Sequence, residues 1–103
     1  MNYKRIIPRI NIKGENVVKT INLEGLKVLG DPNDFSLNYF NEGADEIIFM
    51  DVVATLYNRN NLHNIIKKIS NNIFIPITVG GGIRSIDDAK ILFENGADKV
   101  AIN

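Results

Sequence analysis

Four short apolar segments of the chain each end in residues that can bind an oxyanion or a sugar hydroxyl. Asn11 ends the first, Asp51 the second and Asn103 the fourth, while three glycines at 80–82 follow the third. Asn and Asp side chains hydrogen-bond hydroxyl and phosphate groups, and a glycine turn lets backbone N–H groups approach a ligand. If these segments are neighbouring parallel strands, their ends predict one polar site.

The glycine turn is the clearest candidate anion site, because a helix start follows it. Ser85 and Asp88 have the spacing of a capping box, with Asp in place of Glu or Gln. Free amides and the helix dipole both favour an anion at such a position. We therefore predict that Gly81, Gly82 and Asn103 bind phosphate, the alternative for the glycines being a plain tight turn. The motif is neither a Walker loop nor G-x-G-x-x-G, so no nucleotide is implied.

A second group of charged residues stands at the opposite ends of the same segments. Arg5, Glu46 and Lys99 each begin one of them. Strand alternation places Arg5 on the side of Asn11 and Lys99 on the side of Asn103, so both should point inward. The ordinary interpretation is solvated charge at the base of a sheet. The alternative is an ion-paired ring that closes the base and could serve as a gate.

Lys19 lies on a long connection over residues 13–30, flanked by Val17, Val18 and Ile21. Long ordered loops at an active rim are often lids, so Lys19 is a candidate for reaching a substrate. An exposed lysine on a hairpin arm is the alternative. We find no His, Asp or Glu cluster with metal-ligand spacing and no nucleophile elbow, and we expect no metal and no cofactor.

The elements that must position these residues alternate between strand and helix. Strands are predicted at residues 5–12, 46–51, 75–79 and 99–103, with a short hairpin arm at 17–23. Helices are predicted from Asp31-Pro32 to Gly43, over the apolar series at 62–73, and from Ser85 to Gly96. This order is typical of a parallel α/β fold.

An internal repeat favours one architecture within that class. FNEGADE (40–46) and FENGADK (93–99) share Phe, Gly, Ala and Asp at equivalent places, 53 positions apart. That period equals two strand–helix units, which favours a (β/α)8 TIM barrel over a doubly wound sheet. A complete barrel needs about 250 residues. Residues 1–103 are therefore predicted to be the N-terminal half of a single barrel domain, incomplete by itself.

Composition excludes several classes of partner. The chain has 12 Lys+Arg against 12 Asp+Glu, no Cys and 45% hydrophobic residues. Zero formal net charge argues against nucleic-acid or membrane binding by bulk electrostatics, and no apolar run approaches the roughly 18 residues of a membrane span. The absence of Cys excludes disulfides and thiolate metal sites. We expect a cytoplasmic protein with neither a nucleic-acid nor a membrane partner.

Six segments closely resemble the HisF family, the cyclase subunits of imidazole glycerol phosphate synthase. They are KRIIP (4–8), VVK (17–19), GDP (30–32), GADEIIFMDVVAT (43–55), IPITVGGGIRS (75–85) and GADKVAIN (96–103). The resemblance runs to the last residue without a gap. The related isomerase HisA usually ends its fourth strand with Gly-Ser/Thr rather than Ile-Asn. The chain is also similar to HisF-like proteins of surface-sugar amidination clusters.

The resemblance implies an enzyme, a lyase and cyclase of a glutamine amidotransferase complex in histidine biosynthesis. Such a cyclase takes ammonia from a HisH-like glutaminase docked at the bottom of the barrel. It acts on a phosphorylated ribonucleotide and forms imidazole glycerol phosphate. By position, the chain matches a substrate-phosphate site, the mobile-loop lysine and the charged ring at the ammonia entrance. The substrate-phosphate site is matched by Gly81, Gly82 and Asn103, and the mobile-loop lysine by Lys19. The charged ring is matched by Arg5, Glu46 and Lys99.

One position departs from the family, which places a general acid/base Asp where this chain has Asn11. A carboxamide cannot exchange a proton as a tuned carboxylate can. We still count Asn11, Lys19 and Asp51 as the candidate catalytic positions, and we expect the 103-residue chain alone to be inactive.

Three functions stay open: the histidine-pathway cyclase, ammonia-dependent amidination of a phosphorylated sugar, and a catalytically inert phosphate-binding half-barrel. We also expect self-association, since half a barrel exposes two sheet edges.

Overall fold

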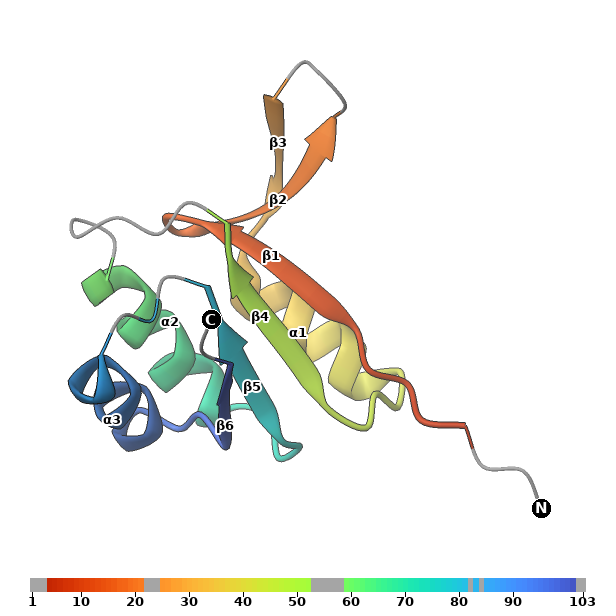
Figure 1. The fold of residues 1–103 in the computed structure, drawn as a ribbon. Coiled ribbons are helices and arrows are strands. Elements are labelled where there is room, and N and C mark those ends of the chain that lie inside the picture. The colour runs from red at the N-terminus through yellow and green to blue at the C-terminus, as the bar shows by residue number, and fades with distance from the viewer. Residues whose placement is uncertain (1–3, 22–24, 53–58, 82, 84, 102–103) are drawn as a thin grey trace.

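The computed structural model describes residues 4–21, 25–52, 59–81, 83 and 85–101. Six strands form one sheet in the order β3-β2-β1-β4-β5-β6, with three helices against one face and the β2–β3 hairpin projecting beyond it (Figure 1). The strands are β1 (Arg9–Lys13), β2 (Asn16–Ile21), β3 (Gly25–Gly30), β4 (Ile47–Asp51), β5 (Ile77–Gly80) and β6 (Lys99–Ala101). The helices are α1 (Pro32–Asn41), α2 (Arg59–Ser70) and α3 (Ile86–Glu94).

The sheet confirms the prediction of a parallel α/β fold that forms part of a barrel. Strands β1, β4, β5 and β6 run parallel, whereas β2 pairs antiparallel with β1 and with β3. β3 and β6 lie at the two ends of the strand order, so the sheet is open. The predicted hairpin arm is longer than expected, because β2 and β3 together occupy most of the connection between β1 and α1.

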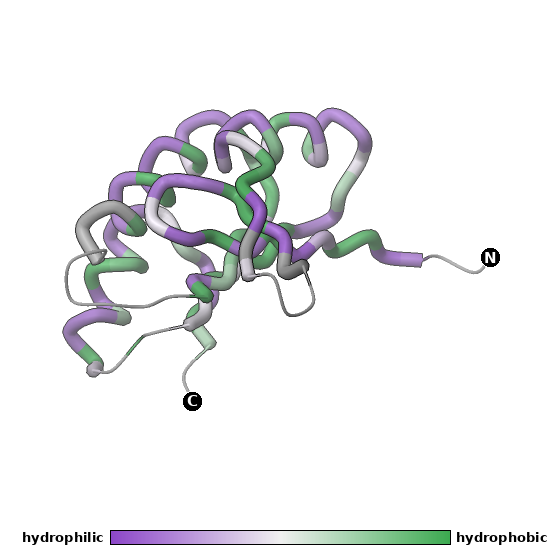
Figure 2. Tube along the Cα trace, turned by 90° about the horizontal axis from the view of Figure 1, so that it is seen from above, coloured by the Kyte–Doolittle hydropathy of each residue, from purple (hydrophilic) through white to green (hydrophobic). Residues whose placement is uncertain are grey.

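The core lies between the helices and one face of the sheet. Alternate strand residues face the helices and are almost fully buried: Ile10, Ile12, Ile47, Phe49, Ile77 and Val79. The helices contribute Leu62, Ile66, Ile69, Ala89 and Leu92. Each large aliphatic side chain buried in this way stabilises the fold by about 1.5–3 kcal/mol. Hydrophilic and hydrophobic residues alternate along the helices, as one-sided burial requires (Figure 2).

Two helix starts confirm their predicted caps. The Asp31 carboxylate accepts the backbone N–H groups of Asn33 at 2.7 Å and Asp34 at 3.3 Å, with Pro32 as the first helical residue. The Ser85 hydroxyl accepts the N–H of residue 88 at 3.1 Å. Each bond satisfies an N–H group that has no partner inside its helix. No helix in the described part of the chain is long and apolar enough to cross a membrane.

The repeated Gly-Ala-Asp sequence ends α1 and α3 in the same way. After α3, Gly96 has φ 116°, and its N–H donates to the Phe93 carbonyl at 3.2 Å while Ala97 donates to Leu92 at 3.0 Å. The same pair of bonds follows α1, at 3.1 and 3.0 Å. This is the Schellman cap, which needs a left-handed residue. A side chain at Gly96 would also overlap Ser70 of α2.

The aspartate of the repeat ties each new strand to the strand beside it. The Asp98 N–H donates to the Ile77 carbonyl at 2.8 Å, and the Asp98 carboxylate accepts the Ile77 N–H at 2.8 Å. Asp45 makes the same two bonds with Ile6, at 2.8 and 2.7 Å. At the base of two strand pairs, the aspartate of the repeat thus donates one hydrogen bond to a residue of the neighbouring segment and accepts one from the same residue. This pair of hydrogen bonds is here called the aspartate clamp.

Three predicted strand starts were wrong, the second by a single residue, since β4 begins at Ile47 and not at Glu46. The first strand was predicted from residue 5 but begins at Arg9, because Ile6 donates to the Asp45 side chain instead of a backbone carbonyl and Pro8 has no N–H to donate. The third was predicted from residue 75 but begins at Ile77, where the Asp98 clamp starts its pairing. Residues 102 and 103 of the fourth predicted strand lie outside the described residues.

We predict that Asp98→Ala lowers the free energy of unfolding by about 1–3 kcal/mol, because it leaves the N–H of Ile77, a residue only 2% exposed, without an acceptor. Asp98→Asn keeps an acceptor oxygen and should cost less than about 1 kcal/mol. Urea unfolding followed by circular dichroism measures both. Equal losses in the two variants would show that the acceptor at this position is not what stabilises the strand pair.

Candidate functional site

The carboxyl ends of the four parallel strands lie at one rim of the sheet (Figure 1). The register aligns Asn11 with Met50, Met50 with Gly80, and Gly80 with Ala101. Neighbouring residues in a parallel register point to the same face, so these four form one row on the face away from the helices, here called the inner face. Asn11, a predicted site residue, therefore lies in the same row as Gly80, the last residue of β5.

Gly80 makes room within this row. A Cβ added to Gly80 would lie 2.7 Å from Sδ of Met50 and 3.2 Å from Cβ of Ala101. The Met50 side chain thus fills the space above Gly80, and the middle of the row is apolar. Hydrogen-bonding groups are left at the ends of the strands rather than across their centre.

Gly81 holds the glycine turn against the neighbouring strand. Its φ of 87° lies in the left-handed region, and any side chain there would overlap the carbonyl of Asp51 at the end of β4. The turn then leads to Ser85, which caps α3. Two features therefore require a glycine at this position: the left-handed backbone angle and the close contact with Asp51. Gly82 and Asn103, the other predicted phosphate ligands, lie outside the described residues.

Asn11 and Asp51, two of the candidate catalytic positions, do not share a face. Asp51 is in register with Ile12, which is buried on the helix side, and it follows Phe49 by two residues on that same side. Asn11 points to the inner face. Alternation along each strand causes the separation, so the two side chains leave their strands on opposite faces of the sheet.

Lys19 does approach Asn11. It lies on β2, exposed, and both residues line one pocket of about 250 Å³. Arg9 lines the same pocket and donates from Nε to Oδ1 of Asn11 at 3.2 Å. Sequence analysis did not single out Arg9 as a site residue, although its place two residues before Asn11 on one strand puts both on the same face.

The three charged residues at the base meet at one carboxylate oxygen. Oε2 of Glu46 lies 3.3 Å from a guanidinium nitrogen of Arg5 and 3.9 Å from Nζ of Lys99. The Glu46 side chain is 11% exposed, against 56% for Arg5 and 66% for Lys99. Burial would penalise an unpaired carboxylate by several kcal/mol, whereas each exposed cation contributes about 0–1 kcal/mol. The geometry therefore matches the ion-paired alternative and not free solvated charges.

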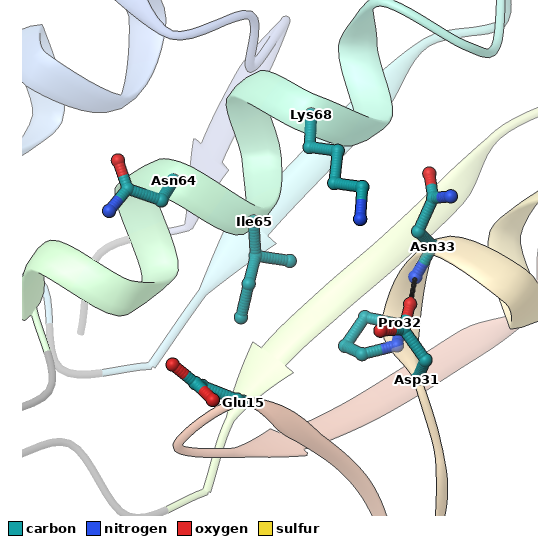
Figure 3. Close-up of a pocket in the computed structure, with 7 residues that line it drawn as sticks. All are labelled: Glu15, Asp31, Pro32, Asn33, Asn64, Ile65 and Lys68. Atoms are coloured by element: carbon teal, nitrogen blue, oxygen red, sulfur yellow. Dashed lines mark hydrogen bonds between the residues drawn. The ribbon is translucent and has the colours of Figure 1, made fainter.

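One pocket was not foreseen from the sequence. Residues of the β1–β2 turn, the start of α1 and the middle of α2 surround a space of about 210 Å³ on the helix side of the sheet (Figure 3). Its carboxylates include Asp31, which is engaged in capping α1. Within the described ranges, no three His, Cys, Asp or Glu residues are placed to hold a metal ion.

Parallel strands backed by helices, with polar strand ends and a glycine turn gathered at one rim, define the class of protein. It is a (β/α)8-barrel protein, of which these residues form one part.

The chain belongs to the histidine biosynthesis protein family, whose model matches residues 5–103. It is similar to the imidazole glycerol phosphate synthase subunit HisF of Legionella pneumophila, with 58% identity over all 103 residues and 49% of that relative. The HisF subunits of Sulfolobus acidocaldarius and Natranaerobius thermophilus are 48% and 45% identical, with 41% and 40% of their lengths covered. The chain thus spans half or less of these relatives, and the resemblance to HisF is confirmed.

Proposed function

We propose that residues 1–103 form half of a single barrel domain of a HisF-like cyclase subunit in histidine biosynthesis, the half with one substrate-phosphate site and the ammonia entrance. The names of relatives up to 58% identical support this role. The observation that carries it is the turn at Gly81, pressed against the end of β4 and leading into a capped helix. A biosynthetic role of this kind is expected in the cytoplasm.

The phosphate site combines backbone N–H groups and a helix start. Gly81 and Gly82 contribute the turn, Asn103 contributes a carboxamide, and the positive end of the α3 dipole favours the anion. The ligand is the phosphate of a sugar or ribonucleotide. In the neighbouring row Met50, Gly80 and Ala101 have no hydrogen-bonding side chain, so among the described residues the backbone N–H groups of the turn are the main donors.

The base of the sheet is the proposed ammonia entrance, with a HisH-like glutaminase as the partner. Ammonia is neutral and small, so it passes a ring of charges only if an ion pair moves aside. Both cations there contact the same oxygen of Glu46, and both are more than half exposed. Moving one cation leaves the carboxylate paired with the other, which lowers the cost of opening.

Catalysis is where this chain differs from its family. Asn11 has no proton to exchange, and its Oδ1 already accepts a bond from Arg9. We therefore propose that the 103-residue chain has no cyclase turnover by itself. The same observation favours two alternatives: a HisF-like protein that directs ammonia to a phosphorylated sugar, and a phosphate-binding half-barrel without turnover.

We expect glycerol phosphate to raise the thermal stability of the chain, by about 1.4 kcal/mol at ten times its Kd. Gly81→Ala should abolish this gain, because a side chain there displaces the turn from Asp51. Gly43→Ala is the matched control, since Gly43 also has a positive φ, of 95°, but nothing within 4 Å of an added Cβ. Differential scanning calorimetry with and without ligand makes the comparison. Loss of the gain in both variants, or in neither, would contradict a phosphate site at the turn.

We also propose that the chain self-associates. The sheet is open, and its inner face carries the half-buried Ile48 and Met50. A few hundred Å² of wet apolar surface costs several kcal/mol at about 25 cal/mol per Å², and a second copy would cover it as a C2 dimer. Light scattering over a dilution series should show the mass rising above that of one 11.5 kDa chain. A folded monomer at all concentrations would refute this.

A further inference from the structure

The residue that ends α3 is an asparagine followed directly by a glycine. Asn95 is the C-cap of α3 and precedes Gly96. Asparagine is thermolabile, because the backbone nitrogen of the next residue can attack its side-chain carbonyl carbon. A glycine in that place has no side chain to hinder the attack. Helix α1 ends in the same kind of cap, but there Asn41 comes first and Glu42 precedes the glycine.

The backbone angle of Asn95 keeps the two reacting atoms apart. Attack would close a succinimide ring, for which the Gly96 nitrogen must turn towards Cβ of Asn95. Asn95 has ψ 1°, so the Gly96 nitrogen instead eclipses the backbone nitrogen of Asn95. Cβ and that nitrogen occupy different corners of the tetrahedron around Cα. The ring therefore cannot close until ψ changes.

Three hydrogen bonds hold this geometry. Nδ2 of Asn95 donates to the Ile91 carbonyl at 2.7 Å, which keeps the carboxamide against the helix. The Gly96 N–H donates to the Phe93 carbonyl at 3.2 Å, so the nitrogen that would attack is engaged. The Ser70 hydroxyl of α2 donates to the Asn95 carbonyl at 3.1 Å and fixes the peptide plane between Asn95 and Gly96. The reaction therefore requires local opening of the cap.

We propose that Asn95–Gly96 is a deamidation site that the folded cap protects and that reacts when the cap opens. In the open cap, the Gly96 nitrogen gives its proton to hydroxide and bonds to Cγ of Asn95. The bond between Cγ and Nδ2 breaks, and Nδ2 takes a proton from water and leaves as ammonia. Water then opens the succinimide at either of its carbonyl groups, which yields an aspartyl or an isoaspartyl residue.

Neither product can rebuild the cap. An aspartate has no N–H to donate to the Ile91 carbonyl, and its negative charge lies at the end of α3 where the helix dipole is also negative. An isoaspartyl residue adds a carbon atom to the backbone, which displaces the N–H groups of Gly96 and Ala97 from their acceptors in the helix. Because Asp98 follows at once, an opening of the cap leaves a lasting chemical change next to the aspartate clamp.

The test follows deamidation at mildly alkaline pH by mass spectrometry of tryptic residues 91–99, among which Asn95 is the only asparagine. A synthetic peptide of residues 91–99 is the unfolded reference. It should react at least about tenfold faster than the intact chain, since the chain reacts only from its open fraction. Ser70→Ala should raise the rate in the chain by roughly two- to tenfold, because the closed cap loses one hydrogen bond.

Ser36→Ala is the matched control, because it removes a hydroxyl that donates to the Pro32 carbonyl at 2.7 Å within α1, away from the cap of α3. It should change the rate less than about twofold, since the cap opens without unfolding of the whole chain. The paired exchange Glu94→Asn and Asn95→Glu gives α3 the order found in α1. It should slow deamidation in the unfolded peptide at least about tenfold, because a glycine no longer follows the asparagine.

Three results would each overturn the proposal. They are equal rates in the intact chain and the reference peptide, equal effects of the two serine variants, and undiminished deamidation after the paired exchange.

Discussion

The register of the parallel strands depends on the aspartate clamp at the base of the sheet. Because side chains alternate with a period of two, a slip of one residue would exchange the buried face of a strand for its open face. Asp98 prevents that slip between β5 and β6, and Asp45 does so beside β1. Each clamp holds its strand pair from both directions, through a backbone bond and a side-chain bond to the same residue. The alignment of the strand ends at the opposite rim depends on these two clamps.

The two ends of the inner face that are aligned in this way differ in their chemical groups. At the base, Glu46 gathers two cations on one oxygen. At the rim, small residues let backbone approach backbone, most closely where Gly81 meets Asp51. The carboxylate at the base is nearly buried and would be costly without its partners, whereas Met50 and Ala101, which flank Gly80 at the rim, carry no charge. This difference is the basis for proposing that ammonia enters at the base and that a phosphate is bound at the rim.

Sequence reasoning succeeded where a feature is local. The caps at Asp31 and Ser85 and the repeat that ends α1 and α3 follow from a few adjacent residues, and the order of elements follows from apolar spacing. It failed where a side chain replaces a backbone partner, as Asp45 does at Ile6, which moved the start of β1. It also grouped Asp51 with Asn11, whereas the register places these two residues on opposite faces, as alternation from Phe49 indicates. The pocket around Arg9 needed the packing of a hairpin against α1, which no local pattern specifies.

The central claim is that the strand ends gather into a phosphate site at the glycine turn, and amide NMR of the ¹⁵N-labelled chain during titration with glycerol phosphate tests it most directly. The account predicts shifts concentrated on Gly81, Ile83 and Ser85, with the clamp residues Ile77 and Asp98 unmoved at the far end of the strand. Shifts confined to the base of the sheet, or an unchanged Gly81 amide at saturating ligand, would contradict it.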